Sequence, residues 1–373
     1  MKVIDLFSGC GGFSVGFSEA GFEITKAVEF DKQIAESYEH NHPGTEMICD
    51  DIKNVDNRGV FKKGEADVII GGPPCQGFSM AGARIRGHSQ LLDDPRNYLF
   101  KHYYNVVNAV KPECFVFENV KGILTKDHGL IFKEIQDLFG SVDDKTGDRY
   151  FVHYQIVNAV NYGVPQERER VIVMGLLNRD FDMDSLFDKT REMIASTDPQ
   201  FFDKVTVWDA ISDLGKPTDD GIVQPHCPLT NYQRYLGADE SPITNHNGTK
   251  HNDVAIKRMK KIGSGENYTK LEENIKSVHS GSYGRMEKDS PSRTITTRFD
   301  TPSGGMFIHP ADNRTITPRE AARIQSFPDS YVFTGTKTSI HKQIGNAVPP
   351  KVAYFLAMAT RCLLNDCSGG KET

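Results

Sequence analysis

The stretch KVIDLFSGCGGFSVGFSEAG, residues 2–21, decides the fold class. Its apolar start, KVIDLF, predicts a buried strand, and GGFSVGFSEAG predicts a helix that ends at Gly21. A glycine turn joins the two. A strand, a glycine turn and a helix in this order form the first unit of a doubly wound α/β sheet, in which ligands bind beyond the carboxyl ends of the strands.

The same alternation continues to residue 177. Apolar runs predict further strands at residues 22–30, 45–52, 66–72, 114–120, 151–159 and 170–177. Helical spacing predicts helices at residues 31–41, 97–110 and 130–140. Repeated strand–helix units with apolar strands favour the α/β class, with a doubly wound and mostly parallel sheet.

The length of 373 residues favours two domains. Beyond about residue 178 the alternation stops, and Ser, Thr, Asn, Gly, Pro and His become frequent. We therefore predict a first domain from residues 1–181 and 332–373, and a smaller, loop-rich second domain from residues 182–331. Residues 348–364, VPPKVAYFLAMATRCLL, predict a long apolar helix that returns to cover the first domain.

Composition limits the class of protein. No stretch approaches the ~20 apolar residues of a membrane span, and the chain starts with a strand pattern, unlike a signal peptide. Seven cysteines without a paired framework indicate free thiols in a reducing cytoplasm, and we expect no metal site. The net charge is −6, yet residues 251–298 hold ten basic and six acidic residues, which is typical of a solvated helix face or of a surface for polyanions.

Three strand ends carry groups suited to a nucleotide-like cofactor. Gly9 and Gly11 allow the backbone to approach a ligand, and the following helix start favours an anion. Ser14 stands where the dinucleotide pattern has its last glycine, so a carboxylate fits as well as a pyrophosphate. Glu29 and Asp51 end the next two strands, where carboxylates can accept hydrogen bonds from ribose hydroxyls and an adenine amino group.

The segment GGPPCQGFS, residues 71–79, holds one cysteine on a rigid mount. Two glycines permit an unusual turn and two prolines fix the backbone, so Cys75 is expected at a strand end beside the cofactor. Glu118 ends another strand, and Arg168 and Arg170 lie on one face of an extended segment. These residues indicate an activated thiolate nucleophile; the alternative is a buried cysteine beside a salt bridge.

Seven segments, in order, resemble the DNA (cytosine-5) methyltransferases of prokaryotes. They are DLFSGCGGFS (5–14), the strand-end acids Glu29 and Asp51, GGPPCQGFS (71–79), ENV (118–120), QERER (166–170), RTITPREAARIQSFPDS (314–330) and IGNAVPP (344–350). The resemblance covers nearly the whole chain. It implies a SAM-dependent methyltransferase sheet with a small target-recognition domain. Ile316 stands where the family often has leucine, which affects no catalytic position.

The resemblance implies a site for S-adenosylmethionine (SAM). It gives Glu29 the ribose hydroxyls and Asp51 the adenine amino group, and it puts Leu99 in the adenine pocket. The implied cofactor residues are Phe7, Gly9, Cys10, Gly11, Gly12, Glu29, Phe30, Asp51, Ile52, Gly72, Pro74, Leu99, Asn346 and Val348.

For the reaction, the resemblance implies that Cys75 attacks C6 of cytosine and makes C5 nucleophilic. Glu118 is then expected at N3 and Arg168 at O2, where charge develops. Arg170 is expected to orient Glu118 or the phosphate, and water to take the C5 proton.

The implied substrate is double-stranded DNA with the target base flipped out. Residues 79–97 resemble a mobile loop that closes over it, and Ser79, Arg84 and Arg86 in this loop are candidate DNA contacts. Roughly residues 182–298 would read the target sequence, with Arg293 and Arg298 as candidate phosphate contacts.

Two alternatives stay open at this point. One is an RNA (tRNA) cytosine-5 methyltransferase, although the Cys-Phe-Thr tripeptide of the tRNA-modifying branch is missing. The other is a catalytically inactive DNA-binding regulator, against which the presence of both Cys75 and Glu118 argues. We expect a monomer in the cytoplasm, associated with the nucleoid, with either a solitary role or a cognate restriction endonuclease as a separate partner.

Overall fold

The computed structural model describes residues 1–56, 59–74, 98–224, 226–237, 241–272, 275 and 281–368. Its elements in chain order are β1 (Lys2–Leu6), α1 (Gly12–Glu19), β2 (Glu23–Val28), α2 (Lys32–Asn41), β3 (Glu46–Ile48), α3 (Ile52–Val55), β4 (Val68–Gly71), α6 (Leu99–Val110), β5 (Cys114–Val120), η2 (Lys121–Leu124), η3 (Lys126–Gly129), α7 (Leu130–Phe139), β6 (Tyr150–Asn158), η4 (Ala159–Tyr162), β7 (Gln166–Glu167), β8 (Glu169–Leu177), α8 (Met183–Thr197), α9 (Val207–Ile211), α10 (Asn231–Leu236), α11 (Asp253–Met259), η5 (Tyr268–Lys270), β9 (Ser292–Arg293), η6 (Pro302–Gly304), α12 (Pro318–Ile324), α13 (Lys337–Asn346) and α14 (Pro350–Ser368).

A seven-stranded sheet forms the centre of the molecule, in the order β3-β2-β1-β4-β5-β8-β6. The pairs β3–β2, β2–β1, β1–β4 and β4–β5 are parallel, whereas β8 runs antiparallel to both β5 and β6. The predicted α/β class with a mostly parallel sheet is confirmed. Since parallel neighbours end at the same edge, the loops after β1, β2, β4 and β5 meet there.

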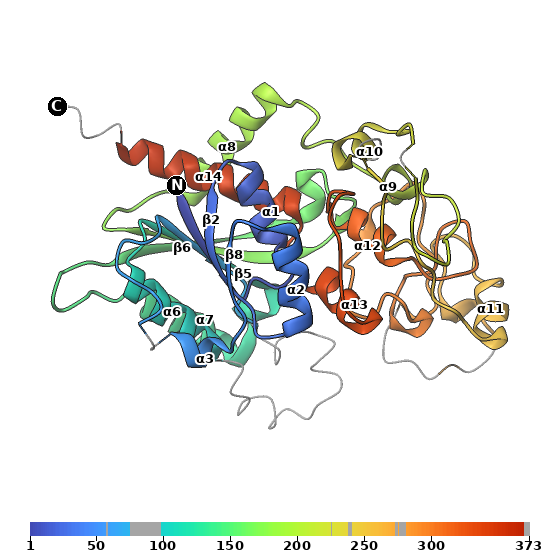
Figure 1. The fold of residues 1–373 in the computed structure, drawn as a ribbon, viewed down its shortest axis with the longest axis horizontal. Coiled ribbons are helices and arrows are strands. Elements are labelled where there is room, and N and C mark those ends of the chain that lie inside the picture. Colours follow the sequence, from blue (N-terminus) through green and yellow to red (C-terminus); the bar gives the residue numbers. More distant parts are fainter. Residues whose placement is uncertain are drawn as a thin grey trace.

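Alternate residues of the strands face two separate helical layers. Val3, Val68 and Val116 point to one side, where α1, α8 and α14 cover the sheet. Ile4 and Phe115 point to the other side, where α6 and α7 cover it (Figure 1). Because the inner strands are buried on both faces, their residues form the near-continuous apolar runs from which they were predicted, whereas the edge strands β3 and β6 are partly exposed.

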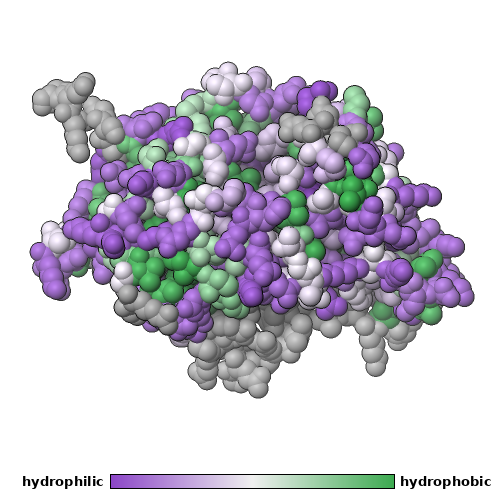
Figure 2. All heavy atoms as spheres, in the orientation of Figure 1, coloured by the Kyte–Doolittle hydropathy of each residue, from purple (hydrophilic) through white to green (hydrophobic). Residues whose placement is uncertain are grey.

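The predicted C-terminal helix is present as α14, and it lies beside α1 on the sheet (Figure 1). The packing is close because Gly16 of α1 has no side chain: a Cβ there would lie 2.3 Å from the Tyr354 nitrogen. The face of the molecule in Figure 2 is mainly hydrophilic, with apolar residues in small patches. Among the described helices, none has the length and apolar character needed to cross a membrane.

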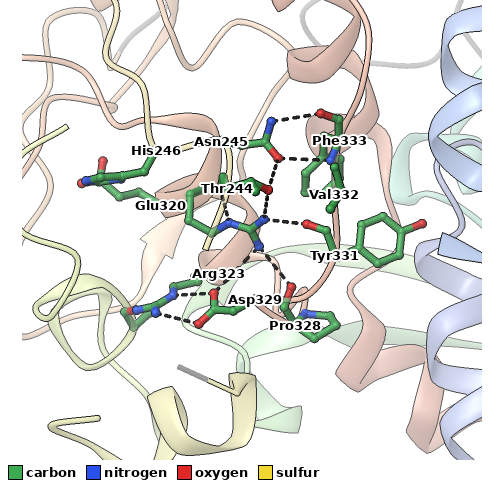
Figure 3. Close-up of polar contacts among 12 residues, drawn as sticks. Thr244, Asn245, His246, Glu320, Arg323, Pro328, Asp329, Tyr331, Val332 and Phe333 are labelled. Atoms are coloured by element: carbon green, nitrogen blue, oxygen red, sulfur yellow. Dashed lines mark hydrogen bonds and ion pairs between the residues drawn. The ribbon is translucent and has the colours of Figure 1, made fainter. Parts of the chain in front are cut away.

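A smaller group of elements around α9, α10, α12 and α13 packs on another apolar core, which also includes Cys10 and Ile34, while α11 packs in a separate small cluster. Buried ions organise the group around α9, α10, α12 and α13. The Arg323 guanidinium pairs with both carboxylate oxygens of Asp329, at 2.8 and 2.7 Å, and with Asp213 (Figure 3). Asn245 bonds to the backbone of Phe333 through its amide nitrogen and its oxygen. Arg323 and Asp329 both belong to residues 314–330, one of the seven segments singled out in the sequence.

The packing of α8 bears on the domain boundaries. Met183, Leu186 and Ile194 of α8 share the apolar cluster of α14 and the sheet, whereas Val205 is the first residue after α8 in the small-domain cluster. In place of the expected division between residues 181 and 182, we therefore propose that the first domain extends to about residue 204. The apolar face of α8 explains the difference, because it requires the sheet-side helices for burial.

Candidate active site

The loop after β1 bends through three residues with positive φ: Phe7 at 56°, Gly9 at 56° and Gly11 at 92°. Around Gly9, no described atom lies within 4 Å of the position that a Cβ would take. At Gly11 a Cβ would instead lie 2.6 Å from Nε2 of His42. Gly9 therefore leaves open space beside the backbone, while Gly11 is required by packing.

Glu29 holds this loop in place. Its Oε2 accepts a hydrogen bond from the Gly9 N–H at 3.0 Å, and its Oε1 accepts one from the Asp31 N–H at 2.9 Å. Burial raises the pKa of the Glu29 carboxyl. Each oxygen keeps a second lone pair, so the carboxylate can still accept from a ligand hydroxyl. The next residue, Phe30, is 71% exposed and offers an aromatic face to a planar group.

An apolar wall lies beside this acid. Ile52 and Leu99 are buried in one cluster, and Phe7 packs against it. Asp51 is exposed at the start of α3, where its Oδ1 accepts from the Lys53 N–H at 3.1 Å. Apolar side chains next to an exposed carboxylate suit an adenine ring with its amino group toward the carboxylate.

The turn after α13 closes the other side of the β1 loop. Gly12 touches it, because a Cβ there would lie 2.3 Å from the Val348 carbonyl oxygen. Asn346 is exposed at the end of α13, and Val348 is buried. Cys10 is buried, its thiol donates to the Gln343 carbonyl at 3.4 Å, and burial raises its pKa to about 12. Cys10 is thus a packing thiol, and only its backbone can face a cofactor.

The segment that leads to Cys75 is anchored to β5. Gly71 lies so close to β1 that a Cβ would be 2.2 Å from the Leu6 carbonyl oxygen. One residue on, the Cβ position of Gly72 is 3.7 Å from Oε2 of Glu118. The Asn119 amide donates to the Pro73 carbonyl at 3.0 Å. The mount, including Pro74, is therefore fixed against the end of β5.

Several predicted residues lie outside the described part of the chain. They are Cys75, Ser79, Arg84 and Arg86.

Glu118 and Arg170 form a pair at the ends of neighbouring strands, β5 and β8. Oε1 of Glu118 lies 2.7 Å from Nε of Arg170, and the two side chains are 12% and 16% exposed. The same Oε1 receives no well-aligned hydrogen bond from any described residue. A carboxylate held at one edge by an arginine, with hydrogen-bonding capacity left over, is suited to meet a polar ligand edge.

Arg168 has a different environment. It is 2% exposed, its Nη1 donates to the carbonyls of Ile295 and Gly345 at 3.3 and 3.2 Å, and its Nη2 donates to that of Ala347 at 2.9 Å. Burial lowers its pKa. Residues 166–170 alternate between buried and exposed as expected for one inward face. However, the chain passes from β7 to β8 at Arg168, so the two arginines reach different neighbours.

Both predicted phosphate contacts are exposed on the small domain. Arg293 lies in β9, which pairs in parallel with β7. Arg298 is 69% exposed on its side chain, where Nη2 donates to the Thr301 hydroxyl at 3.2 Å and Nε lies 4.0 Å from Asp300. The described residues include no group of three His, Cys, Asp or Glu side chains that could hold a metal ion.

Sequence reasoning missed Gln166 and Asn119. Both are buried amides that bond to backbone groups, Asn119 to Pro73 and Gln166 to the Ile295 N–H. Their neighbours in sequence, Glu118 and Arg168, were selected for their charge. A buried amide has no comparable sequence signal, because its importance depends on distant backbone partners.

Comparison with known proteins agrees with this geometry. The family model for C-5 cytosine-specific DNA methylase matches residues 1–361. The type II methyltransferase M.DdeI of Desulfomicrobium norvegicum is 36% identical over 386 residues, covering 96% of this chain and 88% of that protein. The type II methyltransferase M1.HphI of Haemophilus parahaemolyticus is 34% identical over 366 residues, covering 96% and 86%.

Solved structures show the same architecture. A putative DNA modification methyltransferase encoded within an E. coli prophage superposes with a TM-score of 0.74 at 28% identity, over 98% of this chain and 99% of that one. The S. pombe Dnmt2 methyltransferase gives 0.60 at 19% identity, over 97% and 99%, which shows the fold alone. The fold is that of an α/β methyltransferase. The chain belongs to the C-5 cytosine-specific DNA methylase family, and it is a DNA methyltransferase.

Proposed function

We propose that the protein transfers a methyl group from SAM to C5 of a flipped-out cytosine in duplex DNA, through a covalent bond between Cys75 and C6. The position of Glu118 carries the proposal. This acid lies beside Gly72, is paired with Arg170, and faces the turn that leads directly into Cys75. We expect the nucleophile to meet this acid and this arginine at one edge of the sheet.

The residues around the β1 loop fit SAM. The open space at Gly9 admits a ligand against the backbone, and the helix start beyond it favours the carboxylate end of the cofactor. Glu29 can accept from ribose hydroxyls, while Phe30, Ile52 and Leu99 provide apolar surface for adenine. When bound, SAM supplies a methyl group on a positively charged sulfur, which makes that carbon electrophilic.

The chain's own residues activate the base. The Cys75 thiolate forms a bond to C6, the C5–C6 double bond opens, and its electron pair becomes available at C5 for the methyl carbon. Negative charge develops toward N3 and O2. Glu118 meets N3, and we now assign O2 to Arg170, because Arg170 is the arginine paired with Glu118 and both Nη atoms of Arg168 bond to backbone carbonyls. Loss of the C5 proton to water and expulsion of the thiolate restore the aromatic ring.

The target base has to leave the helix to reach this pocket. We propose that the small domain holds the duplex, with Arg293 and Arg298 on phosphates, since both are exposed there. Because the named relatives are type II methyltransferases, we further propose a role in restriction and modification beside a separate cognate endonuclease. We expect the methylase to act as a monomer.

The test is the chemical identity of the product. Unmethylated PCR fragments are incubated with the protein and SAM, digested to nucleosides and analysed by mass spectrometry. We expect 5-methyldeoxycytidine with the wild type, none with Cys75→Ala, and a loss of at least ~100-fold in rate with Glu118→Gln. Cys75→Ala is expected to keep its affinity for DNA.

A product methylated at an exocyclic nitrogen, or full activity of Cys75→Ala, would contradict the proposal. Parallel reactions with tRNA address the RNA alternative, and modification of tRNA with inert duplex DNA would support it instead.

A further inference from the structure

Two buried side chains of residues 166–168 hold one residue of the small domain by its backbone. Gln166 Oε1 accepts from the Ile295 N–H at 2.8 Å, and Arg168 Nη1 donates to the Ile295 carbonyl at 3.3 Å. Gln166 is fully buried and Arg168 is 2% exposed, so water does not compete for these bonds. Ile295 lies between Arg293 and Arg298, the residues proposed to contact phosphates.

The same two side chains reach the turn that borders the SAM site. Arg168 donates to the carbonyls of Gly345 and Ala347, on either side of Asn346. Gln166 donates to Gln325 Oε1 at 2.8 Å, and Gln325 donates to the Ile344 carbonyl at 2.7 Å. The two segments also touch directly, because a Cβ at Gly345 would lie 2.5 Å from the carbonyl carbon of Thr296.

An arginine is specifically required at this junction. Its planar group directs several N–H donors along fixed directions, whereas a lysine offers one compact ammonium on a flexible stem. Among the described residues no carboxylate forms an ion pair with Arg168, and its two Nη atoms donate to three backbone carbonyls. Nη1 is shared between Ile295 and Gly345, and displacement of one carbonyl therefore alters the bond to the other.

We infer that Arg168 and Gln166 are positioning residues that couple the DNA-contact segment, residues 293–298, to the cofactor turn, residues 344–348. This inference rests on the proposed function. A cofactor that orders the turn also orders Ile295 through the shared guanidinium. Binding of the duplex then costs less conformational entropy, because part of its contact segment is already ordered. By linkage, each ligand raises the affinity for the other by the same factor.

The experiment measures the dissociation constant of S-adenosylhomocysteine by calorimetry, without and with a saturating pool of unmethylated PCR fragments. We expect the duplex to tighten binding at least ~5-fold in the wild type. In Arg168→Lys this ratio should fall below two, whatever happens to the affinity of S-adenosylhomocysteine alone. A purely structural role would weaken both constants together and leave the ratio unchanged.

Arg179→Lys is the matched control, because Arg179 also donates to backbone carbonyls, those of Leu363 and Asp366, at the far end of α14. It should keep the wild-type ratio. Gln166→Met removes the acceptor for the Ile295 N–H and should reduce the ratio as well, and it decides the question if Arg168→Lys does not fold.

A wild-type ratio near one, or an unchanged ratio in the folded junction variants, would overturn the inference. Failure of the proposed function looks different, since the wild type would then bind no S-adenosylhomocysteine and make no 5-methylcytosine.

Discussion

Asp5 and Ser14 explain why the β1 loop departs from the dinucleotide-binding pattern. The Ser14 hydroxyl donates to Oδ2 of Asp5 at 2.6 Å and lies 2.7 Å from the Tyr38 hydroxyl. A glycine at position 14 could not make these bonds. Oδ1 of Asp5 has no partner among the described residues, and the side chain is fully buried. Burial raises the pKa of Asp5 to about 7.

This pKa predicts a pH-dependent contribution to stability. In the unfolded chain Asp5 ionises near its ordinary value of 3.8, whereas in the folded protein it stays protonated to about pH 7. Its contribution is therefore complete below pH 3.8 and is lost as the pH rises through 7. Asp5→Asn removes the titration and keeps the shape. Its free energy of unfolding relative to the wild type should increase between pH 5 and pH 8, by on the order of a few kcal/mol.

Urea unfolding at both pH values checks this difference. A Ser14→Ala variant serves as control, because it removes the hydrogen bonds of Ser14 to Asp5 and Tyr38 but leaves the titrating carboxyl in place. If Asp5→Asn and the wild type differ by the same amount at pH 5 and pH 8, the carboxyl titrates normally.

At the scale of elements, the apolar runs predicted every strand of the large sheet, but they did not predict how the strands pair. β8 is antiparallel to β5 and β6, and a strand buried on both faces has the same sequence pattern in either direction. From the pattern we assigned α8 to the second domain, although it packs with the first. Its partners on α14 are more than 150 residues away in sequence, so the pattern could not indicate this packing.

Individual residues of the candidate site could be predicted from the sequence where their role depends on contacts within or between neighbouring strands. Glu118 is at a strand end, and its pairing with Arg170 follows from the antiparallel register in which Val120 lies opposite Arg170. The role of Arg168 was not predictable, since its three carbonyl acceptors come from residues 295, 345 and 347. Backbone partners that are this far away in sequence produce no recognisable pattern around the arginine.

Close packing of α1 on α14 yields a prediction at this scale. A Cβ at Gly16 would lie 2.3 Å from the Tyr354 nitrogen and 2.5 Å from the Pro350 carbonyl oxygen, both of which are backbone atoms. Gly16→Ala should therefore separate the two helices and lower the free energy of unfolding by about 1–3 kcal/mol. Because α14 follows the turn at Val348, binding of S-adenosylhomocysteine should weaken as well.

Gly44→Ala is the control for this variant. No described atom lies within 4 Å of a Cβ at that position, and its φ is not positive. Its stability should stay within about 0.5 kcal/mol of the wild type. If urea unfolding gives the same free energy of unfolding for both variants, the two helices accommodate the added methyl group without loss of stability.

For the whole molecule, the loop after β1, the turn that leads to Cys75 and the Glu118–Arg170 pair lie at one edge of the sheet, and the small domain carries exposed arginines. The shared buried contacts at Arg168 join the two domains. This organisation suits the proposed function, in which one domain holds the duplex and the other modifies an extruded base.

The most direct test of this account is a duplex in which fluorine replaces the C5 hydrogen of cytosine, prepared by PCR with 5-fluoro-dCTP. Fluorine cannot leave as the proton does, so after methyl transfer the bond between Cys75 and C6 cannot be broken by elimination. With SAM present, we predict a protein–DNA complex that survives a denaturing gel for the wild type and is missing for Cys75→Ala. Efficient methylation of the ordinary duplex without any trapped complex on the fluorinated one would contradict the account.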